Sequence, residues 1–217
     1  MSHLVNMLKR YAVLSVCESD IQKAFKLIKE SYHNGGKLLV CGNGGSAADS
    51  GHIVGELMKG FMLHRVLPTD IQQKIKASVP HGDYISQNLQ GALPAISLVS
   101  EAPLISAYAN DVAADMVFAQ QVYGHARVGD CLICISTSGN AKNVLYAAET
   151  AKVMGMKTIA LTGESGGELK QACDVSICVP SAVTPEVQEY HLPIYHTLCM
   201  MLEEEFFGYE RGNSTCH

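Results

Sequence analysis

The chain has 217 residues, of which 47% are hydrophobic, and a formal net charge of −5. This length and composition suffice for one globular domain with a sizeable core. The sequence has no run of about 18 apolar residues, which a membrane-spanning helix needs, and residues 1–10 lack the apolar segment of a secretory signal. The acidic balance argues against non-specific nucleic-acid binding. We therefore expect a cytoplasmic protein without nucleic-acid or membrane partners.

Eight cysteines could form disulfides, but their contexts favour buried, reduced thiols. Cys41 and several others lie in apolar runs typical of strands. Cys131 and Cys134 form a Cys-x-x-Cys pair, yet both lie within one predicted strand, where alternation turns them to opposite faces. We therefore expect neither a zinc site nor a redox pair from them, in keeping with a cytosolic protein.

Helical structure is predicted before the first strand. Apolar residues at spacings of three and four indicate helix over residues 3–31. Ser19 or Asp20 could cap a second helix within this segment. A glycine pair at residues 35–36 ends it. Residues 1–34 are thus expected to form a helical arm that packs against a neighbouring element or another subunit.

A glycine-rich turn follows the first predicted strand, residues 38–41. The turn comprises Gly42, Asn43, Gly44, Gly45 and Ser46. Its glycines allow positive φ and close approach of a ligand to the backbone. Ser46 is the predicted N-cap of a helix over residues 47–63, with Asp49 completing a capping box. The free N–H groups and dipole of a helix N-terminus favour an anion, although an ordinary tight turn remains an alternative.

The remaining pattern alternates strands with helices. Strands are predicted at residues 93–98, 131–136, 158–161 and 175–179, and helices at 113–123, 141–155 and 184–207. Such alternation predicts an α/β fold of three αβα layers around a central five-stranded parallel sheet. Pro193 should kink the last helix or interrupt its hydrogen bonds. Residues 64–91 contain too few apolar residues for a core, so we expect a surface insertion within a single domain spanning residues 1–217.

A second polar turn follows the strand at residues 131–136. It comprises Ser136, Thr137, Ser138, Gly139 and Asn140. Hydroxyl groups and free N–H groups can hold a phosphate without a basic residue, although such a segment is also a common cap and turn. Both polar turns lie at carboxyl ends of predicted strands, where parallel sheets bind their ligands.

Two pairs of side chains suggest a metal site. His52 and Glu56 are four residues apart and share a helix face, while Gln188 and His196 lie on one broad side of the last predicted helix. Two histidines and a carboxylate, with Gln188 as a weaker fourth ligand, suit Zn²⁺. Surface pairs of this kind are also common without a metal, and His191 competes with His196 as the second histidine.

These motifs resemble the sugar-isomerase (SIS) domain and, more narrowly, the phosphoheptose isomerases. The resemblance rests on residues 41–46, 135–140 and 187–191 and covers the chain from about residue 37 to 207. It implies a flavodoxin-like fold, a homotetramer with sites near subunit contacts, and one Zn²⁺ per subunit. It also implies isomerisation of sedoheptulose 7-phosphate to D-glycero-D-manno-heptose 7-phosphate through an enediolate, a step toward lipopolysaccharide precursors.

The same resemblance assigns roles to residues of this chain. It makes Glu56 the catalytic base and His196 the acid, and it assigns the metal to His52, Glu56, Gln188 and His196. The substrate-binding residues that it implies are Asn43, Gly44, Gly45, Ser46, Asn110, Asp111, Ser136, Thr137, Ser138 and Gln188.

Three departures from the family pattern leave alternatives open. Ala141 replaces a usual hydroxyl residue, Pro185 stands where some members have an acidic residue (with Glu186 next to it), and the segment at residues 64–91 is long. A non-catalytic SIS protein, either a sugar-phosphate sensor or a regulator of the replication-initiation type, is one alternative, and etherase or amino-sugar chemistry is another. The metal and acid/base set favours an enzyme, because a protein-binding scaffold has no need of it.

Overall fold

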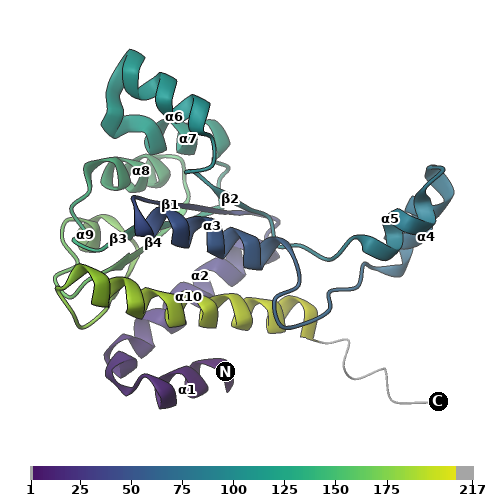
Figure 1. Cartoon of the computed structure of the whole chain (residues 1–217), viewed down its shortest axis with the longest axis horizontal. Helices are drawn as coiled ribbons and strands as arrows, with labels where there is room; N and C mark the ends of the chain where they lie inside the picture. Colours follow the sequence, from purple (N-terminus) through teal and green to yellow (C-terminus); the bar gives the residue numbers. More distant parts are fainter. Residues whose placement is uncertain (1, 209–217) are drawn as a thin grey trace.

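The computed structural model of the chain describes residues 2–208 and shows helices on both faces of a sheet (Figure 1). The elements are α1 (Ser2–Arg10), a 3₁₀ helix (Ala12–Cys17), α2 (Glu18–His33), β1 (Leu38–Gly42), α3 (Gly45–Met58), α4 (Thr69–Ser78), α5 (Gly82–Asn88), β2 (Ala95–Ser97), α6 (Ala102–Tyr108), a π-helix (Ala109–Ala113), a 3₁₀ helix (Ala114–Met116), α7 (Val117–His125), β3 (Cys131–Ser136), α8 (Lys142–Val153), β4 (Lys157–Thr162), α9 (Leu169–Ala172), β5 (Val175–Cys178) and α10 (Thr184–Phe207).

Within residues 2–208, five parallel strands form one sheet in the order β2-β1-β3-β4-β5. The chain moves from β1 outward to β2 and then returns to the other side of β1 for β3, so the strand order reverses between β1 and β3. At this point Gly42 of β1 pairs with Ile135 of β3. Sheets of this order bind ligands beyond the carboxyl ends of these two strands. The predicted three-layer α/β fold with a five-stranded parallel sheet is confirmed.

Alternate side chains of the strands enter two cores, one on each face of the sheet. Leu38 and Val40 of β1 pack with α1, α2, α3 and α10, whereas Leu39 and Cys41 pack with α7, α8 and α9. Cys131 and Cys134 lie in different cores, so they face opposite sides of the sheet as predicted. Every cysteine within residues 2–208 is a free thiol, and Cys216 lies outside the described part of the chain.

Two predicted helix starts are wrong. α2 begins at Glu18, after Cys17, without a side-chain cap from Ser19 or Asp20. α3 begins at Gly45, so Ser46 lies inside the helix, and the N-cap position belongs to Gly44 at φ +55°. Glycine adopts positive φ without the steric cost that other residues have. With Gly44 in this conformation, the helix begins at Gly45, one residue before Ser46.

The last helix, α10, is continuous through Pro193. Proline removes one N–H, which leaves the carbonyl of Glu189 without its helical partner. Glu189 is exposed, so water can satisfy that carbonyl. The carbonyl of Pro193 itself accepts a bond from the Thr197 hydroxyl, 2.7 Å away. The interruption expected from Pro193 is therefore limited to one hydrogen bond.

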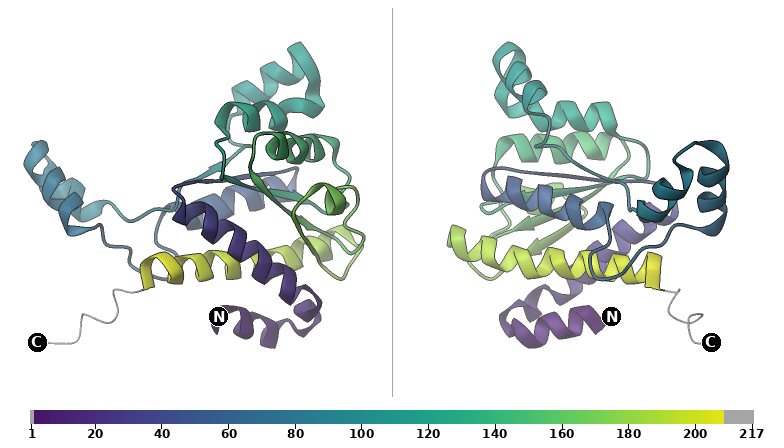
Figure 2. Two further views of the ribbon diagram at one scale, coloured as in Figure 1. Left: turned by 180° about the vertical axis from the view of Figure 1, so that it is seen from behind. Right: turned by 45° about the vertical axis from the view of Figure 1, so that its right-hand side comes forward.

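The N-terminal helices pack on the same side of the sheet as α10, and Leu4 and Met7 bury α1 against it (Figure 2). Among residues 2–208, no helix combines the length and apolar character needed to cross a membrane.

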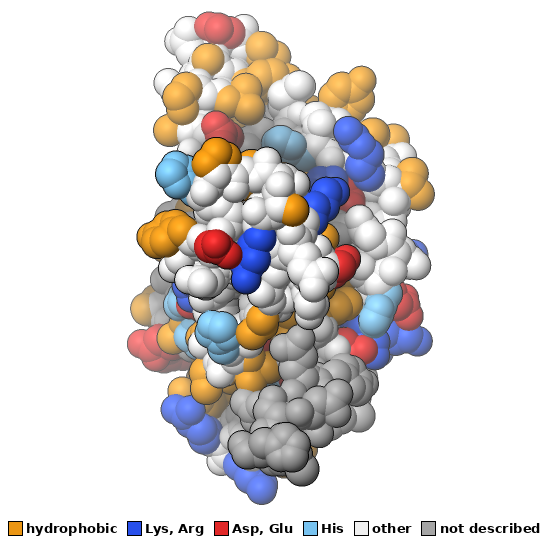
Figure 3. All heavy atoms as spheres, turned by 90° about the vertical axis from the view of Figure 1, so that its right-hand side faces the viewer, with side chains coloured by type: hydrophobic (Ala, Val, Ile, Leu, Met, Phe, Trp, Pro, Cys, Tyr) orange, Lys and Arg blue, Asp and Glu red, His pale blue; other side chains and the backbone are white. Residues whose placement is uncertain are grey.

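The segment at residues 64–91 forms a helical hairpin, α4 and α5, that projects away from the sheet instead of lying over it (Figures 1 and 2). The Gln- and Lys-rich residues 68–80 predict a surface helix, which α4 confirms, whereas residues 81–91 have no apolar periodicity and gave no signal for α5. None of the side chains of α4 is buried. On the face seen in Figure 3, acidic and basic side chains are interspersed, in keeping with the modest net charge.

Candidate active site

The glycine turn brings bare backbone against α10. A Cβ atom on Gly45 would lie 2.5 Å from Nε2 of Gln188, and one on Gly42 would lie 2.7 Å from the carbonyl oxygen of Ser46. Larger residues at these positions would displace α10 or the first turn of α3. The turn therefore fixes where Gln188 lies: its amide sits at the N-terminal end of α3.

The loop after β3 is held in place by hydrogen bonds within it and to its neighbours. Gly139 adopts φ +69° against the backbone of Gly166. The N–H of Asn140 donates to Oγ of Ser138 at 3.2 Å, and the Asn140 side chain accepts from the N–H of Glu168 at 3.0 Å. α8 starts two residues later, so its N-terminus faces the same point as these hydroxyls. The loop has the donors for a phosphate that the sequence predicted.

A reciprocal amide pair joins these two turns. Asn43 Nδ2 donates to Asn143 Oδ1, and Asn143 Nδ2 donates to Asn43 Oδ1, both at 2.9 Å. This pair spans the position where the strand order reverses. The sequence predicted a role for Asn43 and missed Asn143, whose partner is 100 residues away.

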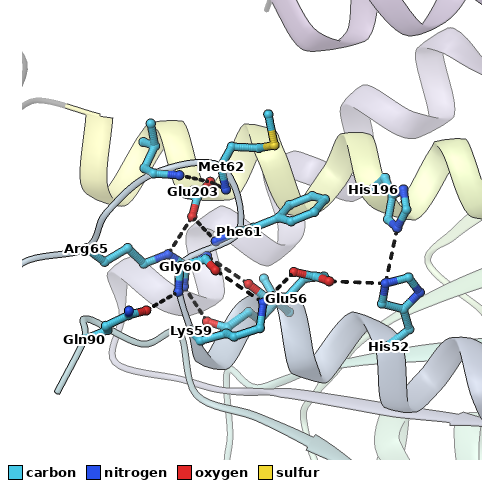
Figure 4. Close-up of polar contacts among 12 residues, drawn as sticks. His52, Glu56, Lys59, Gly60, Phe61, Met62, Arg65, Gln90, His196 and Glu203 are labelled. Atoms are coloured by element: carbon cyan, nitrogen blue, oxygen red, sulfur yellow. Dashed lines mark hydrogen bonds and ion pairs between the residues drawn. The ribbon is translucent and has the colours of Figure 1, made fainter. Parts of the chain in front are cut away.

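Three of the predicted side chains meet further along α3 (Figure 4). Nε2 of His52 lies 3.2 Å from Oε1 of Glu56 and 3.5 Å from Nε2 of His196. The His52 side chain is 43% exposed and that of Glu56 is 13% exposed. Oε2 of Glu56 also pairs with Lys59 at 3.1 Å. Burial and the neighbouring His52 lower the pKa of His196, and Glu56 opposes them.

Other predicted residues lie elsewhere. Gln188 sits against Gly45, about 10 Å from His52 by the rise of a helix. Asn110 and Asp111 lie exposed in the π-helix and bond to each other at 2.9 Å. Within residues 2–208, no group of three or more His, Cys, Asp or Glu side chains is arranged so that it could hold a metal ion. Both short contacts of the histidine cluster run through His52.

His191 does not compete with His196. It is fully buried, and neither ring nitrogen has a hydrogen-bond partner among the described residues. Burial lowers its pKa to about 4, and the backbone of Thr162, outside hydrogen-bonding geometry, opposes this only weakly. The alternative that His191 is a ligand is therefore wrong. A spacing of three residues from Gln188 turns it into the core instead.

A buried ion pair that the sequence did not reveal holds the end of α3 (Figure 4). Glu203 of α10 accepts from Nε of Arg65 at 2.8 Å and from the N–H groups of residues 61–63. Arg65 in turn donates to the carbonyls of Leu57 at 2.6 Å and Glu56 at 2.9 Å. The pair caps the helix that carries Glu56 and anchors the base of the α4–α5 hairpin.

Comparisons with known proteins identify the family of the chain. The SIS domain family matches residues 6–89 and 90–163 of the chain. A phosphoheptose isomerase of Citrifermentans bemidjiense is 40% identical over 187 residues, which cover 86% of this chain and 84% of that protein. One from Nitratiruptor sp. is 42% identical over 177 residues, covering 82% and 81%. The chain belongs to the phosphoheptose isomerase family.

Solved structures of this family share the fold. A phosphoheptose isomerase from Neisseria gonorrhoeae superposes with a TM-score of 0.72 at 30% identity, covering 94% of this chain and 96% of the other. One from Francisella tularensis gives the same TM-score and identity, covering 94% and 95%. The sequence resemblance to SIS proteins and to phosphoheptose isomerases is confirmed, and the family supplies a sugar-phosphate isomerase activity against which the site can be judged.

Proposed function

We propose that this chain is a single-domain, cytoplasmic ketose–aldose isomerase that converts sedoheptulose 7-phosphate to D-glycero-D-manno-heptose 7-phosphate. The observation that carries the proposal is the meeting of His52, Glu56 and His196 on two helices beside the reversal point of the sheet. Family membership supports the same activity. The phosphate and the reacting carbons would then lie toward opposite ends of α3.

The length of α3 supports a long sugar phosphate. From Gly45 to His52 the helix rises by about 10 Å. A seven-carbon chain with a terminal phosphate spans a comparable distance, whereas a triose phosphate is much shorter. Ser136, Thr137 and Ser138 would bind the phosphate with hydroxyl and N–H donors. The residues from Asn43 to Ser46, with Asn110, Asp111 and Gln188, would bind the sugar hydroxyls.

The isomerisation moves a proton between C1 and C2 through an enediolate. Glu56 is the base in this proposal, because a largely buried carboxylate in the cluster can take the proton from carbon. His196, kept neutral by its lowered pKa, holds a ring hydrogen that it can give to the carbonyl oxygen. The neutral imidazole can thereby stabilise the enediolate by donating a hydrogen bond to its oxygen.

Two donor-atom separations in the cluster suit a divalent metal, and we propose one Zn²⁺ per subunit. Ligand atoms of a tetrahedral zinc site are about 3.3 Å apart, close to the 3.2 and 3.5 Å separations around Nε2 of His52. His52, Glu56 and His196 would hold the ion, and ligand exchange would free Glu56 and His196 for proton transfer. Gln188 is the fourth ligand that the family resemblance implies, although its amide lies about 10 Å along α3 from His52 in this structure. A bound zinc ion supplies Lewis-acid polarisation of the carbonyl.

The half-exposed His52 supports a site completed by a neighbouring subunit of a homotetramer. Sedimentation velocity would test the tetramer, and a monomer at micromolar concentration would contradict it. Ala141 lacks the hydroxyl that the family pattern has at this position for the phosphate, and the Glu186 side chain accepts from the Ser181 hydroxyl at 2.7 Å. These two differences affect binding strength more than the reacting groups.

An isomerase assay with sedoheptulose 7-phosphate, combined with metal analysis, tests the function. Wild-type protein should turn over this substrate in preference to shorter ketose phosphates, lose activity with a chelator and regain it with Zn²⁺. His196→Ala should lower kcat by about 10²–10⁴-fold, the usual worth of a positioned acid. His33→Ala is the matched control, because His33 also pairs with a glutamate, at 3.3 Å, away from the cluster. Absence of turnover by wild type overturns the proposal and favours a non-catalytic SIS protein.

A further inference from the structure

Both ring nitrogens of His52 have partners, and the partner of Nδ1 has no part in the proposed function. Nε2 faces Glu56 and His196, whereas Nδ1 lies 3.0 Å from the hydroxyl of Tyr195. Tyr195 is 2% exposed and precedes His196 in α10. The two rings meet edge to face, with centroids 5.5 Å apart. The position of the His52 ring is therefore fixed from the core side.

The hydroxyl of Tyr195 already uses its hydrogen in another hydrogen bond. It donates to Oδ1 of Asp49 at 3.2 Å. A phenol has a single hydrogen, so toward His52 its oxygen is an acceptor. The hydrogen in that contact must then come from Nδ1 of His52. Because the bond made by one ring nitrogen sets the state of the other, Nε2 carries the lone pair.

The position of Asp49 is energetically unfavourable. Its second oxygen, Oδ2, is buried without a hydrogen-bond partner among the described residues. Buried unpaired polar atoms are rare and disfavour folding, so one in a native structure calls for an explanation. Asp49 lies one turn before His52 on α3, where its first oxygen reaches Tyr195. Orientation of the tyrosine hydroxyl accounts for a carboxylate at this position.

We propose that Asp49 and Tyr195 are positioning residues that hold the hydrogen of His52 on Nδ1 and aim the lone pair of Nε2 at Glu56 and His196. The hydrogen position on His52 does not depend on the proposed function; only its consequence for catalysis does. The lone pair of Nε2 then faces the Glu56 carboxylate at 3.2 Å, and a cation between them would relieve the repulsion. Histidine ligands of metals commonly donate their other N–H to such a partner.

The first test reads the hydrogen on His52 directly. In protein with ¹⁵N-labelled histidine, ring ¹H–¹⁵N correlation spectra are recorded with and without Zn²⁺, and His52→Asn identifies the signals. We expect hydrogen on Nδ1 in wild type and loss of its protection from exchange in Tyr195→Phe. Hydrogen on Nε2 alone overturns the proposal. This measurement needs no turnover, so it stands apart from the fate of the proposed function.

The second test measures Zn²⁺ affinity by competition with a chelating dye. Tyr195→Phe should weaken binding about 10- to 100-fold, the usual effect of losing such a partner. Tyr32→Phe is the matched control, because it also removes one buried hydroxyl bond, to the Pro94 carbonyl at 3.2 Å, and should leave affinity within twofold. Equal effects of the two variants overturn the positioning role.

Asp49 acts through Tyr195, so the two substitutions should not add. Asp49→Asn should weaken Zn²⁺ binding in the wild-type background and change it less than twofold in Tyr195→Phe. Additive losses mean that Asp49 contacts the ion or His52 by another route, which contradicts the relay.

Discussion

Replacing Glu203 by glutamine tests the buried ion pair that ends the Glu56-bearing helix. Each oxygen of Glu203 accepts two hydrogen bonds. Oε1 receives Phe61 N–H at 2.7 Å and Arg65 Nε at 2.8 Å, while Oε2 receives Met62 N–H at 2.7 Å and Leu63 N–H at 3.1 Å. A glutamine NH₂ in either orientation faces two donors, and the guanidinium loses its counter-charge.

The expected cost follows from burial. Glu203 is 1% exposed and Arg65 equally buried, and removing one partner of such a pair costs about 3–5 kcal/mol. This is a large part of the roughly 5–15 kcal/mol that holds a typical domain together. In urea, the unfolding midpoint of Glu203→Gln should fall by about 1 M or more with an unchanged slope. Lys23→Met, which breaks an exposed pair with Asp20, should cost at most about 1 kcal/mol.

A double variant separates the charge from the backbone bonds. Arg65→Met with Glu203→Leu removes both charges, which alone is often neutral. Here it also leaves three N–H groups, at residues 61–63, without acceptors, each worth about 1–3 kcal/mol. The double variant should therefore remain unstable relative to wild type while losing less than the sum of the single changes. A loss below about 1 kcal/mol in Glu203→Gln refutes the reasoning.

Two further predictions concern His191 and the amide pair. Since His191 is neutral in the fold, with a pKa of about 4 against 6.5 unfolded, the unfolded chain binds the extra proton, and stability should fall by about 3 kcal/mol as the pH drops from 6.5 to 4. Urea titrations across this range should show a flatter profile for His191→Leu, and parallel profiles contradict the assignment. Asn143→Ala should raise KM for the sugar phosphate about threefold or more with little change in kcat, and adding Asn43→Ala should do little further. A fall in kcat alone would place Asn143 elsewhere in the reaction.

Local sequence pattern was sufficient for the sheet and for the turns that carry the motifs. Strands β1, β3 and β4 are buried on both faces, so they appear as apolar runs bounded by glycine or polar residues. The spacing of His52 and Glu56 likewise fixes their shared helix face whatever the tertiary structure. The predicted start of α3 was wrong because the positive φ of Gly44 outweighed the capping preference of Ser46. The short α5 was not predicted because its sequence has no apolar face.

The residues that the sequence could not reveal are those paired over long separations. Glu203 lies 138 residues from Arg65, and Tyr195 lies 143 residues from His52. Neither partner carries a local signature, since a glutamate in a long helix ordinarily faces solvent and a tyrosine ordinarily fills a core. His191 shows the converse problem. Helical spacing alone allowed it or His196 to face α3, and only the packing of α10 against β4 excludes His191.

The site depends on one structural relation, the register of α10 along α3. α10 contacts α3 and the residues that follow it at intervals of about two turns. These contacts join Gln188 to Gly45, Tyr195 and His196 to His52, and Glu203 to Phe61. A shift of α10 by one residue would rotate all of them out of contact together. Because α10 keeps nearly all of its backbone hydrogen bonds through Pro193, it sets the positions of three parts of the site together. These are the proposed sugar-binding turn, the reacting groups and the cap of α3.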